Sequence, residues 1–278
     1  MSSFLFGGVF KMKKVLTIAG SDSCGGAGIQ ADLKTMSAIG VYGMSVITAV
    51  TAQNTMGVVD VLEVDKDMVS RQIQCIFEDI KVDAVKIGMV SNAEIINVIK
   101  ESLIKYKPKN IVVDPVMVSK SGYFLLKEEA VKELKNLISI ADVVTPNIPE
   151  AEVLTGIEIK DEEDMKRAAQ IILKLGVKDV LIKGGHRCND ANDILYTGEK
   201  FITLEGERMD TKNTHGTGCT LSSAIASYLS KGLDMEKALF LSKKYINEAI
   251  RNSFSIGEGV GPVGHFIELY KKGGVDYE

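Results

Sequence analysis

Short runs of aliphatic and β-branched residues alternate along this chain with longer stretches whose apolar residues recur every three or four positions. The short runs are typical of strands buried on both faces, and the longer stretches are typical of helices. A β-hairpin is predicted over 193–204, with its turn at Thr197 and Gly198. The pattern further predicts strands at 15–19, 45–51, 84–87, 111–113, 143–145 and 180–182, and helices over 27–39, 66–79, 92–105, 127–138, 162–175, 219–231 and 235–252.

This alternation predicts an α/β fold with a mainly parallel central sheet that helices cover on both faces. No linker, internal repeat or change of composition divides the chain, so residues 12–278 are expected to form a single domain. Residues 1–11 precede the first periodic segment and are expected to be a disordered extension. In such sheets ligands bind beyond the carboxyl ends of the strands, where most of the candidate functional residues fall.

Composition and charge narrow the class of protein. The chain has 278 residues, 45% of them hydrophobic and 25% charged, as in an ordinary globular protein. Its net charge of -4 argues against broad binding to nucleic acid or anionic membranes, and we see no secretory signal or membrane-spanning run. The four cysteines lack C-x-x-C spacing, so we expect no structural zinc site and a cytoplasmic protein with reduced thiols.

The segment Thr214–Leu221 combines two glycines with the start of a predicted helix. Gly216 and Gly218 let the backbone turn tightly, and the helix start directs free N–H groups and a partial positive charge at one point. Such an anion hole suits a phosphoryl group in transit. Cys219 stands where a thiolate is stabilised and could accept a proton. A simple glycine turn with a buried cysteine remains the alternative.

A second glycine-rich segment, 20–32, leads from a predicted strand into a helix. Within it, Gly26–Ala31 fits the pattern G-x-G-x-x-A of dinucleotide-binding folds. Those folds place an acidic residue at the end of the next strand, whereas here that strand ends in Thr51-Ala52-Gln53-Asn54. The dinucleotide interpretation is therefore disfavoured, and the chain contains no P-loop motif.

Four polar residues near predicted strand ends are candidates for ligand contacts. Asp114 and Glu150 could hold a magnesium ion, which needs few protein ligands beside phosphates. Alternatively, Asp114 is a turn residue and Glu150 an acid favoured in a first helical turn. Lys183 could reach a phosphate or could be a solvated strand-end lysine. Gln53 could pair with an aminopyrimidine edge or cap a turn. His186 and His215 lack partners at metal spacing.

Taken together, these motifs resemble the ribokinase-like family of small-molecule kinases, in the branch that phosphorylates hydroxymethylpyrimidine and its phosphate in thiamine biosynthesis. The resemblance extends from Lys13 to Phe266. It is carried by LTIAGSDSCGGAGIQADLKT, YGMSVITAVTAQNT, KIGM, DPVM, TPNIPEAEVL, IKGGH and NTHGTGCTLSSAIA, and weakly by GEGVGPVGHF.

The resemblance implies a three-layer αβα sandwich, ATP and Mg²⁺ as cofactors, and a homodimer. It implies that Cys219 is the base within an anion hole, that Gln53 pairs with the pyrimidine, and that Ser119–Gly122 is a flap over the phosphates. The other implied roles are the anion hole for Gly216, Thr217 and Gly218, the pyrimidine slot for Gly20, Ala27, Asp32, Met89 and Val116, the magnesium and phosphate site for Asp114, Asn147 and Glu150, and ATP contacts for Lys183 and Lys243.

Three other functions stay open. A pyridoxal kinase of the same branch is the nearest, although some of those enzymes carry a second cysteine in the flap where this chain has Ser119. A dinucleotide-dependent oxidoreductase would use Gly26–Ala31. A non-catalytic pyrimidine sensor would need neither Cys219 nor the pair of acids.

Overall fold

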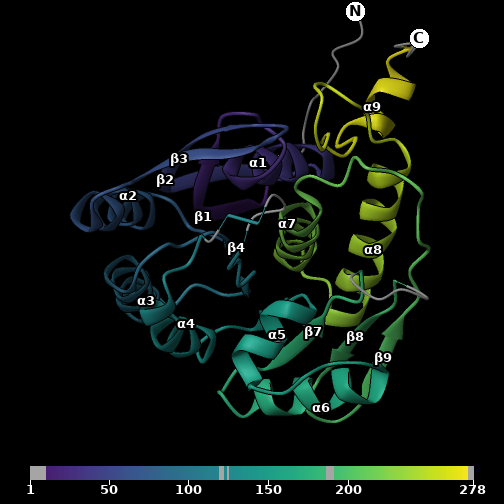
Figure 1. The fold of residues 1–278 in the computed structure, drawn as a ribbon. Coiled ribbons are helices and arrows are strands. Elements are labelled where there is room, and N and C mark those ends of the chain that lie inside the picture. Colours follow the sequence, from purple (N-terminus) through teal and green to yellow (C-terminus); the bar gives the residue numbers. More distant parts are fainter. Residues whose placement is uncertain (1–10, 119–121, 124, 186–190, 275–278) are drawn as a thin grey trace, which may run out of the picture.

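One sheet of nine strands runs through the computed structural model, which describes residues 11–118, 122–123, 125–185 and 191–274 (Figure 1). The strands are β1 (Lys14–Asp22), β2 (Tyr42–Asn54), β3 (Gly57–Glu63), β4 (Ala84–Ile87), β5 (Ile111–Val113), β6 (Val143–Val144), β7 (Asp179–Ile182), β8 (Asp193–Tyr196) and β9 (Phe201–Leu204). They lie in the order β3-β2-β1-β4-β5-β6-β7-β8-β9. In this order the strands β2, β1, β4, β5, β6 and β7 pair in parallel. At one edge β3 is antiparallel to β2, and at the other edge β7, β8 and β9 form antiparallel pairs.

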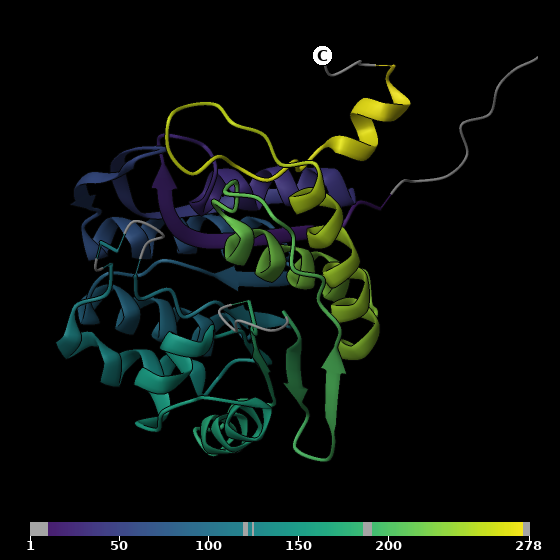
Figure 2. The same ribbon diagram turned by 45° about the vertical axis from the view of Figure 1, so that its right-hand side comes forward.

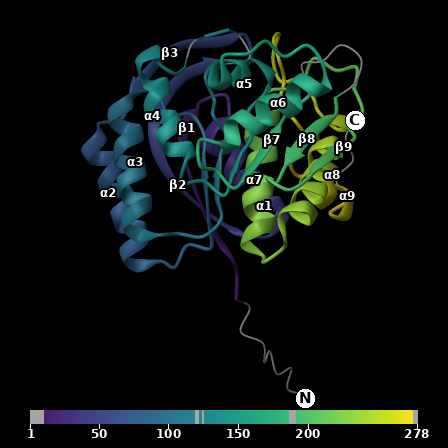
Figure 3. The ribbon, with the colours of Figure 1, turned by 90° about the horizontal axis from the view of Figure 1, so that it is seen from below.

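Helices cover both faces of this sheet, as Figures 2 and 3 show from two further directions. The helices are α1 (Gly28–Ile39), α2 (Lys66–Asp79), α3 (Ala93–Tyr106), α4 (Val131–Ile138), α5 (Ile148–Thr155), α6 (Glu162–Leu173), α7 (Thr217–Ser230), α8 (Met235–Arg251) and α9 (Ile267–Lys272). Helices α2 to α6 pack on one face, and α1, α7 and α8 pack on the other. The predicted α/β fold with a mainly parallel sheet is confirmed.

The two cores follow from the alternation of side chains along each strand. Leu16 and Val85 face α2 and α3, whereas their neighbours Val15 and Ala84 face α1 and α7. All four side chains are fully buried. Strands buried on both faces are therefore uniformly apolar, which is the pattern from which they were predicted.

Capping residues set the predicted helix starts. The side chain of Asp65 accepts hydrogen bonds from the backbone at the start of α2, and Asn92 does the same for α3. Helix α2 and strands β4 and β5 have the predicted boundaries. Within the described ranges, none of the helices is long and apolar enough to cross a membrane.

Four features differ from the sequence predictions. Strand β1 continues to Asp22 rather than turning at Gly20, and α4 begins at Val131 after a short 3₁₀ turn instead of at residue 127. Strand β3 was not predicted, because its position at the edge leaves neither of its faces buried. Helices α5 and α9 were not predicted because they have only 8 and 6 residues.

Candidate active site

The candidate residues gather at the carboxyl ends of the parallel strands, as the fold class predicts. Gln53 lies near the end of β2, and Lys183 directly follows β7. The remaining positions are Gly20 and Asp22 in β1, Met89 after β4, Asp114 and Val116 after β5, and Asn147 and Glu150 after β6. A hollow lined by Lys13, Asp83 and Asn110 lies at the opposite, amino ends of the strands and contains none of them.

Helix α7 begins with an open turn. Gly216 stands before the helix with φ 77°, a left-handed conformation that suits glycine, and no side chain caps the helix start. Within the described part of the chain, no recorded hydrogen bond uses the N–H of Gly218 or Cys219. These two groups and the helix dipole can therefore attract an anion, as predicted for the 216–219 turn.

Burial acts against the expected stabilisation of a Cys219 thiolate at this helix start. Removal from water raises the pKa of the Cys219 thiol to about 11. The charge of Lys86 and a hydrogen bond from the Gly28 backbone oppose this shift, whereas Asp32 and Asp114 add to it. The half-buried thiol is thus protonated at neutral pH.

A lysine and two carboxylates lie directly beside the anion-binding turn. Lys183 Nζ is 2.8 Å from Asp114 Oδ1 and 3.9 Å from Glu150 Oε2. A Cβ atom on Gly218 would stand 3.3 Å from the same Nζ and 3.5 Å from Asp114 Oδ2. Lys183 is only 14% exposed, which rules out the solvated strand-end lysine considered for it. The cluster places a fixed positive charge where a phosphate oxygen would bind.

Glu150 and Asn147 form a capping box at the start of α5. Asn147 Oδ1 accepts from the Glu150 backbone at 2.9 Å, and Glu150 Oε2 accepts from the Asn147 backbone at 2.8 Å. These contacts agree with the first-turn role that the sequence allowed for Glu150. Burial raises its pKa to about 7, with the charge of Asp114 adding and that of Lys183 opposing.

The donor set fits a magnesium ion bound together with phosphates. Burial alone would raise the pKa of Asp114, but Lys183 and Lys86 hold it below its usual range, so this carboxylate is ionised. Glu150 supplies a second hard oxygen donor, and Mg²⁺ needs only one or two protein carboxylates when substrate phosphates complete its shell. Accordingly, the described residues contain no cluster of three or more ligating side chains.

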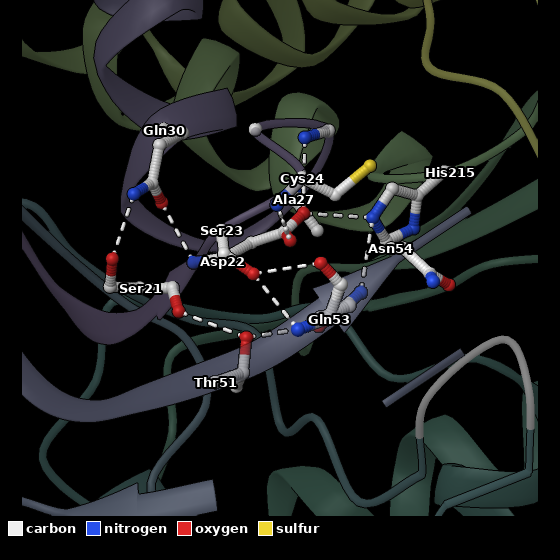
Figure 4. Close-up of polar contacts among 12 residues, drawn as sticks. Ser21, Asp22, Ser23, Cys24, Ala27, Gln30, Thr51, Gln53, Asn54 and His215 are labelled. Atoms are coloured by element: carbon white, nitrogen blue, oxygen red, sulfur yellow. Dashed lines mark hydrogen bonds and ion pairs between the residues drawn. The ribbon is translucent and has the colours of Figure 1, made fainter. Parts of the chain in front are cut away.

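Gln53 lies on the same side of the molecule as the anion-binding turn. Its Nε2 is 3.2 Å from Nε2 of His215, which precedes Gly216 in the chain (Figure 4). Its backbone is fixed by Ser23, whose hydroxyl accepts from the Gln53 N–H at 2.9 Å and donates to the Gln53 carbonyl at 2.7 Å. Gln53 thus lies beside His215, although 162 positions separate them in the chain.

The candidates for the apolar substrate slot lie in β1, after β4, after β5 and before α1. Met89 is 8% exposed, and its Sδ would stand 3.0 Å from a Cβ atom on Gly20. A side chain at position 20 would therefore displace Met89. Val116 is half-buried after β5, and Ala27 is half-buried before α1.

Asp22 belongs to the candidate site through contacts that the sequence did not reveal. Its carboxylate accepts the backbone N–H groups of Cys24, Gly26 and Ala27 at 2.8 to 3.0 Å. It also contacts His215 Nε2 at 2.8 Å (Figure 4). Three amides of the glycine turn are thus occupied by the Asp22 side chain, which supports a structural role for the glycine pattern at 26–31.

The structure corrects the expectation that Asp32 lines the pyrimidine slot. Asp32 is fully buried, and both of its oxygens bind the equally buried ammonium of Lys86 at 2.8 and 2.9 Å. The hydroxyls of Thr17 and Ser223 each donate to it at 2.6 Å. Ser223 lies one turn after Cys219 in α7, so its hydrogen bond to Asp32 connects this helix to the buried ion pair.

Two further candidates have different outcomes. The ammonium of Lys243 binds Asp193 at 2.6 Å and the Ala191 carbonyl at 3.1 Å, so its contact with ATP stays a prediction. Ser119 of the expected flap, His186 and residues 1–10 lie outside the described residues.

Solved structures with this architecture define the class of the protein. A crystal structure of phosphomethylpyrimidine kinase from Clostridium difficile matches with a TM-score of 0.78 and 58% identity, over 86% of this chain and 99% of that one. Pyridoxal kinase from Staphylococcus aureus in complex with AMP-PCP matches with a TM-score of 0.86 and 36% identity, over 92% and 94% of the two chains. The fold is that of the ribokinase-like phosphotransferases.

Sequence comparison specifies the family. Residues 22–264 match the phosphomethylpyrimidine kinase family, and the chain belongs to it. It is 50% identical to the hydroxymethylpyrimidine/phosphomethylpyrimidine kinase of Rhizobium meliloti, over 92% of this chain and 98% of that one. It is also 50% identical, over 93% of its length, to a bifunctional thiamine biosynthesis protein of Geobacter sulfurreducens, of which it spans about half (53%).

Proposed function

We propose that this protein is an ATP-dependent kinase that phosphorylates 4-amino-5-hydroxymethyl-2-methylpyrimidine and then phosphorylates the resulting monophosphate to the diphosphate in thiamine biosynthesis. One juxtaposition carries the proposal. The uncapped start of α7, with Lys183 and Asp114 beside it, lies on the same side of the sheet as Gln53. A turn that could bind a phosphoryl group and a carboxamide that could pair with a heterocycle thus lie close together.

The residues divide the work between positioning and charge stabilisation. In the first transfer the hydroxymethyl oxygen attacks the γ-phosphorus of ATP, the bond to the bridging oxygen breaks, and ADP leaves. The N–H groups of Gly218 and Cys219 and the ammonium of Lys183 would stabilise charge on the transferring group. The hydroxyl proton would go to Cys219 in the minor fraction of molecules whose thiol is ionised, and Thr217 would help to shape the turn.

On the substrate side, Gln53 would pair with the amino group and a ring nitrogen of the pyrimidine. Gly20, Ala27, Met89 and Val116 would form the apolar slot around the ring. In the second transfer the acceptor is a phosphate, which is already ionised and needs no base.

Asp114 and Glu150 would hold Mg²⁺ together with the phosphates of ATP, and Asn147 would keep Glu150 in place through the capping box. When bound, the ion would supply positive charge that neutralises phosphate oxygens. Lys243 would contact the nucleotide after exchanging its bond to Asp193.

Pyridoxal is the second candidate substrate, because the pyridoxal kinase of Staphylococcus aureus shares the fold over 92% of this chain. ATP consumption measured separately with hydroxymethylpyrimidine, its phosphate and pyridoxal tests the assignment. We expect both pyrimidines to be used and pyridoxal to have a much lower kcat/KM. Turnover of pyridoxal alone would assign the chain to the second activity, and turnover of none would contradict both.

We further propose that the enzyme acts in the cytoplasm as a homodimer. The ribbon formed by β2 and β3 exposes Met56, Val59 and Leu62 at 67%, 76% and 72%, and an apolar edge of this kind favours association with another chain. Light scattering on the purified protein should give the mass of two chains, and Leu62→Glu should give the mass of one. A monomeric wild-type protein would contradict the proposal.

A further inference from the structure

The carboxamide of Gln53 is held at both ends by side chains from other parts of the site. Its Nε2 atom lies 3.2 Å from Nε2 of His215, and its Oε1 atom lies 3.2 Å from the hydroxyl of Thr51. The hydroxyl of Thr51 also lies 3.0 Å from the Ser21 carbonyl. Figure 4 shows these groups converging from the ends of β1 and β2 and from the loop before α7.

Asp22 determines where the proton of the His215 ring nitrogen lies. Burial alone would raise the pKa of Asp22, but hydrogen bonds from His215, Ala27 and Cys24 hold it below its ordinary value. An ionised carboxylate can only accept, so Nε2 of His215 carries a hydrogen and donates it to Asp22 at 2.8 Å. Nε2 therefore has no free lone pair with which to accept a hydrogen bond from the neighbouring carboxamide.

We propose that His215, held by Asp22, is a positioning residue that sets the orientation of the Gln53 carboxamide and thereby the heterocycle that the enzyme accepts. The oxygen and nitrogen ends of a carboxamide have nearly the same shape, so hydrogen bonding rather than packing decides between them. Because the Nε2–H of His215 points to Asp22, Nε2 has no lone pair left for the nitrogen end of the carboxamide, whereas the oxygen end can share that hydrogen. The Thr51 hydroxyl, whose hydrogen goes to Ser21, can accept from the nitrogen end. A carboxamide with its oxygen toward His215, the reverse of the orientation described above, therefore satisfies both neighbours.

That orientation determines which substrate edge fits. One lone pair of the Gln53 oxygen and one N–H of its nitrogen remain available, side by side. An amino group next to a ring nitrogen matches this edge, whereas a pyridine without an amino group does not. The reversed carboxamide would oppose its own NH₂ group to the amino group of the substrate. The inference rests on the proposed pyrimidine kinase activity and names the residues that make it selective.

The same histidine is built into the loop that binds the phosphoryl group. A Cβ atom on Gly26 would overlap the His215 ring, and a Cβ atom on Gly216 would overlap the Gly26 carbonyl. The ring is thus packed against the turn at Gly26, and its backbone belongs to the turn at Gly216. A substitution that removes the hydrogen bond should therefore keep a planar ring.

A double-mutant cycle tests the proposal. His215→Phe keeps a ring and removes the donor, and we expect the KM for the pyrimidine to rise by about 10- to 100-fold with a smaller change in kcat. The preference for pyrimidine over pyridoxal should fall by a similar factor. In a Gln53→Ala background the same substitution should change KM by less than about threefold, because the carboxamide is absent. His215→Gln, which restores an N–H donor, should recover part of the loss.

His265→Phe is the matched control. His265 is also buried and bonds Thr220 Oγ1 at 3.0 Å without a recorded contact to Gln53, so its substitution should leave the substrate preference unchanged. An equal rise in KM in both backgrounds would overturn the positioning role while leaving the kinase activity intact. If His215→Phe does not fold, Thr51→Val removes the other contact, and additivity with Gln53→Ala overturns the proposal equally. A wild-type chain without pyrimidine turnover would contradict the proposed function itself.

Discussion

At Cys219, two opposing effects act on a single thiol. The helix start and Lys86 favour the thiolate, but the loss of water around the sulfur outweighs them and raises the pKa to about 11. Lys183 shows the opposite balance, because Asp114 and Glu150 outweigh burial and raise the pKa of its ammonium. The site therefore holds a permanent cation next to a thiol that is ionised only rarely.

This balance predicts how the first transfer depends on pH. If Cys219 takes the hydroxyl proton, the kcat/KM for hydroxymethylpyrimidine should rise about tenfold per pH unit between pH 7 and 9, as the thiolate fraction increases. The kcat/KM for the monophosphate should lack this dependence on Cys219. Cys219→Ala should slow the first transfer by about 10²-fold or more and the second by much less. Single-turnover assays of both steps across pH measure these effects.

Cys219→Asp provides the control, since an aspartate ionises at much lower pH and should flatten the pH profile of the first transfer. Equal losses in both transfers for Cys219→Ala would show that Cys219 shapes the site without acting as a base. A pH profile that stays steep in Cys219→Asp would assign the titration to another group.

Among the elements, α1, β4 and α7 are joined by one buried ion pair. Lys86 of β4 and Asp32 of α1 are both fully buried, and Ser223 of α7 donates to the same carboxylate. Burial lowers the pKa of an ammonium, but Asp32 and the nearby Cys219 and Asp114 outweigh it here, so Lys86 remains charged. Removing one partner leaves an uncompensated charge in the core.

We therefore expect Lys86→Met to lower the free energy of unfolding by about 3–5 kcal/mol, and Lys86→Met combined with Asp32→Asn to recover most of this loss. Urea denaturation of both variants measures the difference. Lys66→Met removes a surface partner of Glu94 and should change stability little, which makes it the matched control. A double variant as unstable as the single one would mean that the pair stabilises the fold beyond balancing charge.

The elements that the sequence predicted are those whose burial leaves a pattern. Strands such as β4 are mostly apolar because helices cover both faces of the sheet. The start of α2 is marked in the sequence by its capping residue, Asp65. Strand β3 has no buried residue and therefore no comparable pattern. The motifs placed Gln53, Lys183 and the anion-binding turn correctly at strand and helix ends. They could not reveal that Asp22 bonds His215, because 193 positions separate the two residues and neither motif contains the other.

For the whole molecule, the site joins segments from nearly the entire described chain. Asp22 ends the first strand, and Lys183 follows the seventh. The turn before α7 is anchored by the bond from the His215 N–H to the Gly261 carbonyl at 3.0 Å. The two cores share the same central strands, so neither can unfold while the other keeps its sheet. A substitution that destabilises the site should therefore lower the stability of the whole domain.

We expect a single cooperative thermal transition for the whole protein, which tests the single-domain organisation predicted for 12–278. Ligands that bind only the folded state shift such a transition as one unit. Nucleotide and pyrimidine together, at about 100 times their dissociation constants, should raise Tm by about 5–10 °C. Differential scanning calorimetry with and without ligands measures the shift, and pyrimidine without nucleotide serves as the control. Two transitions, of which only one moves with ligand, would show that the halves of the sheet unfold separately, because linkage acts only on the unit that contains the binding site.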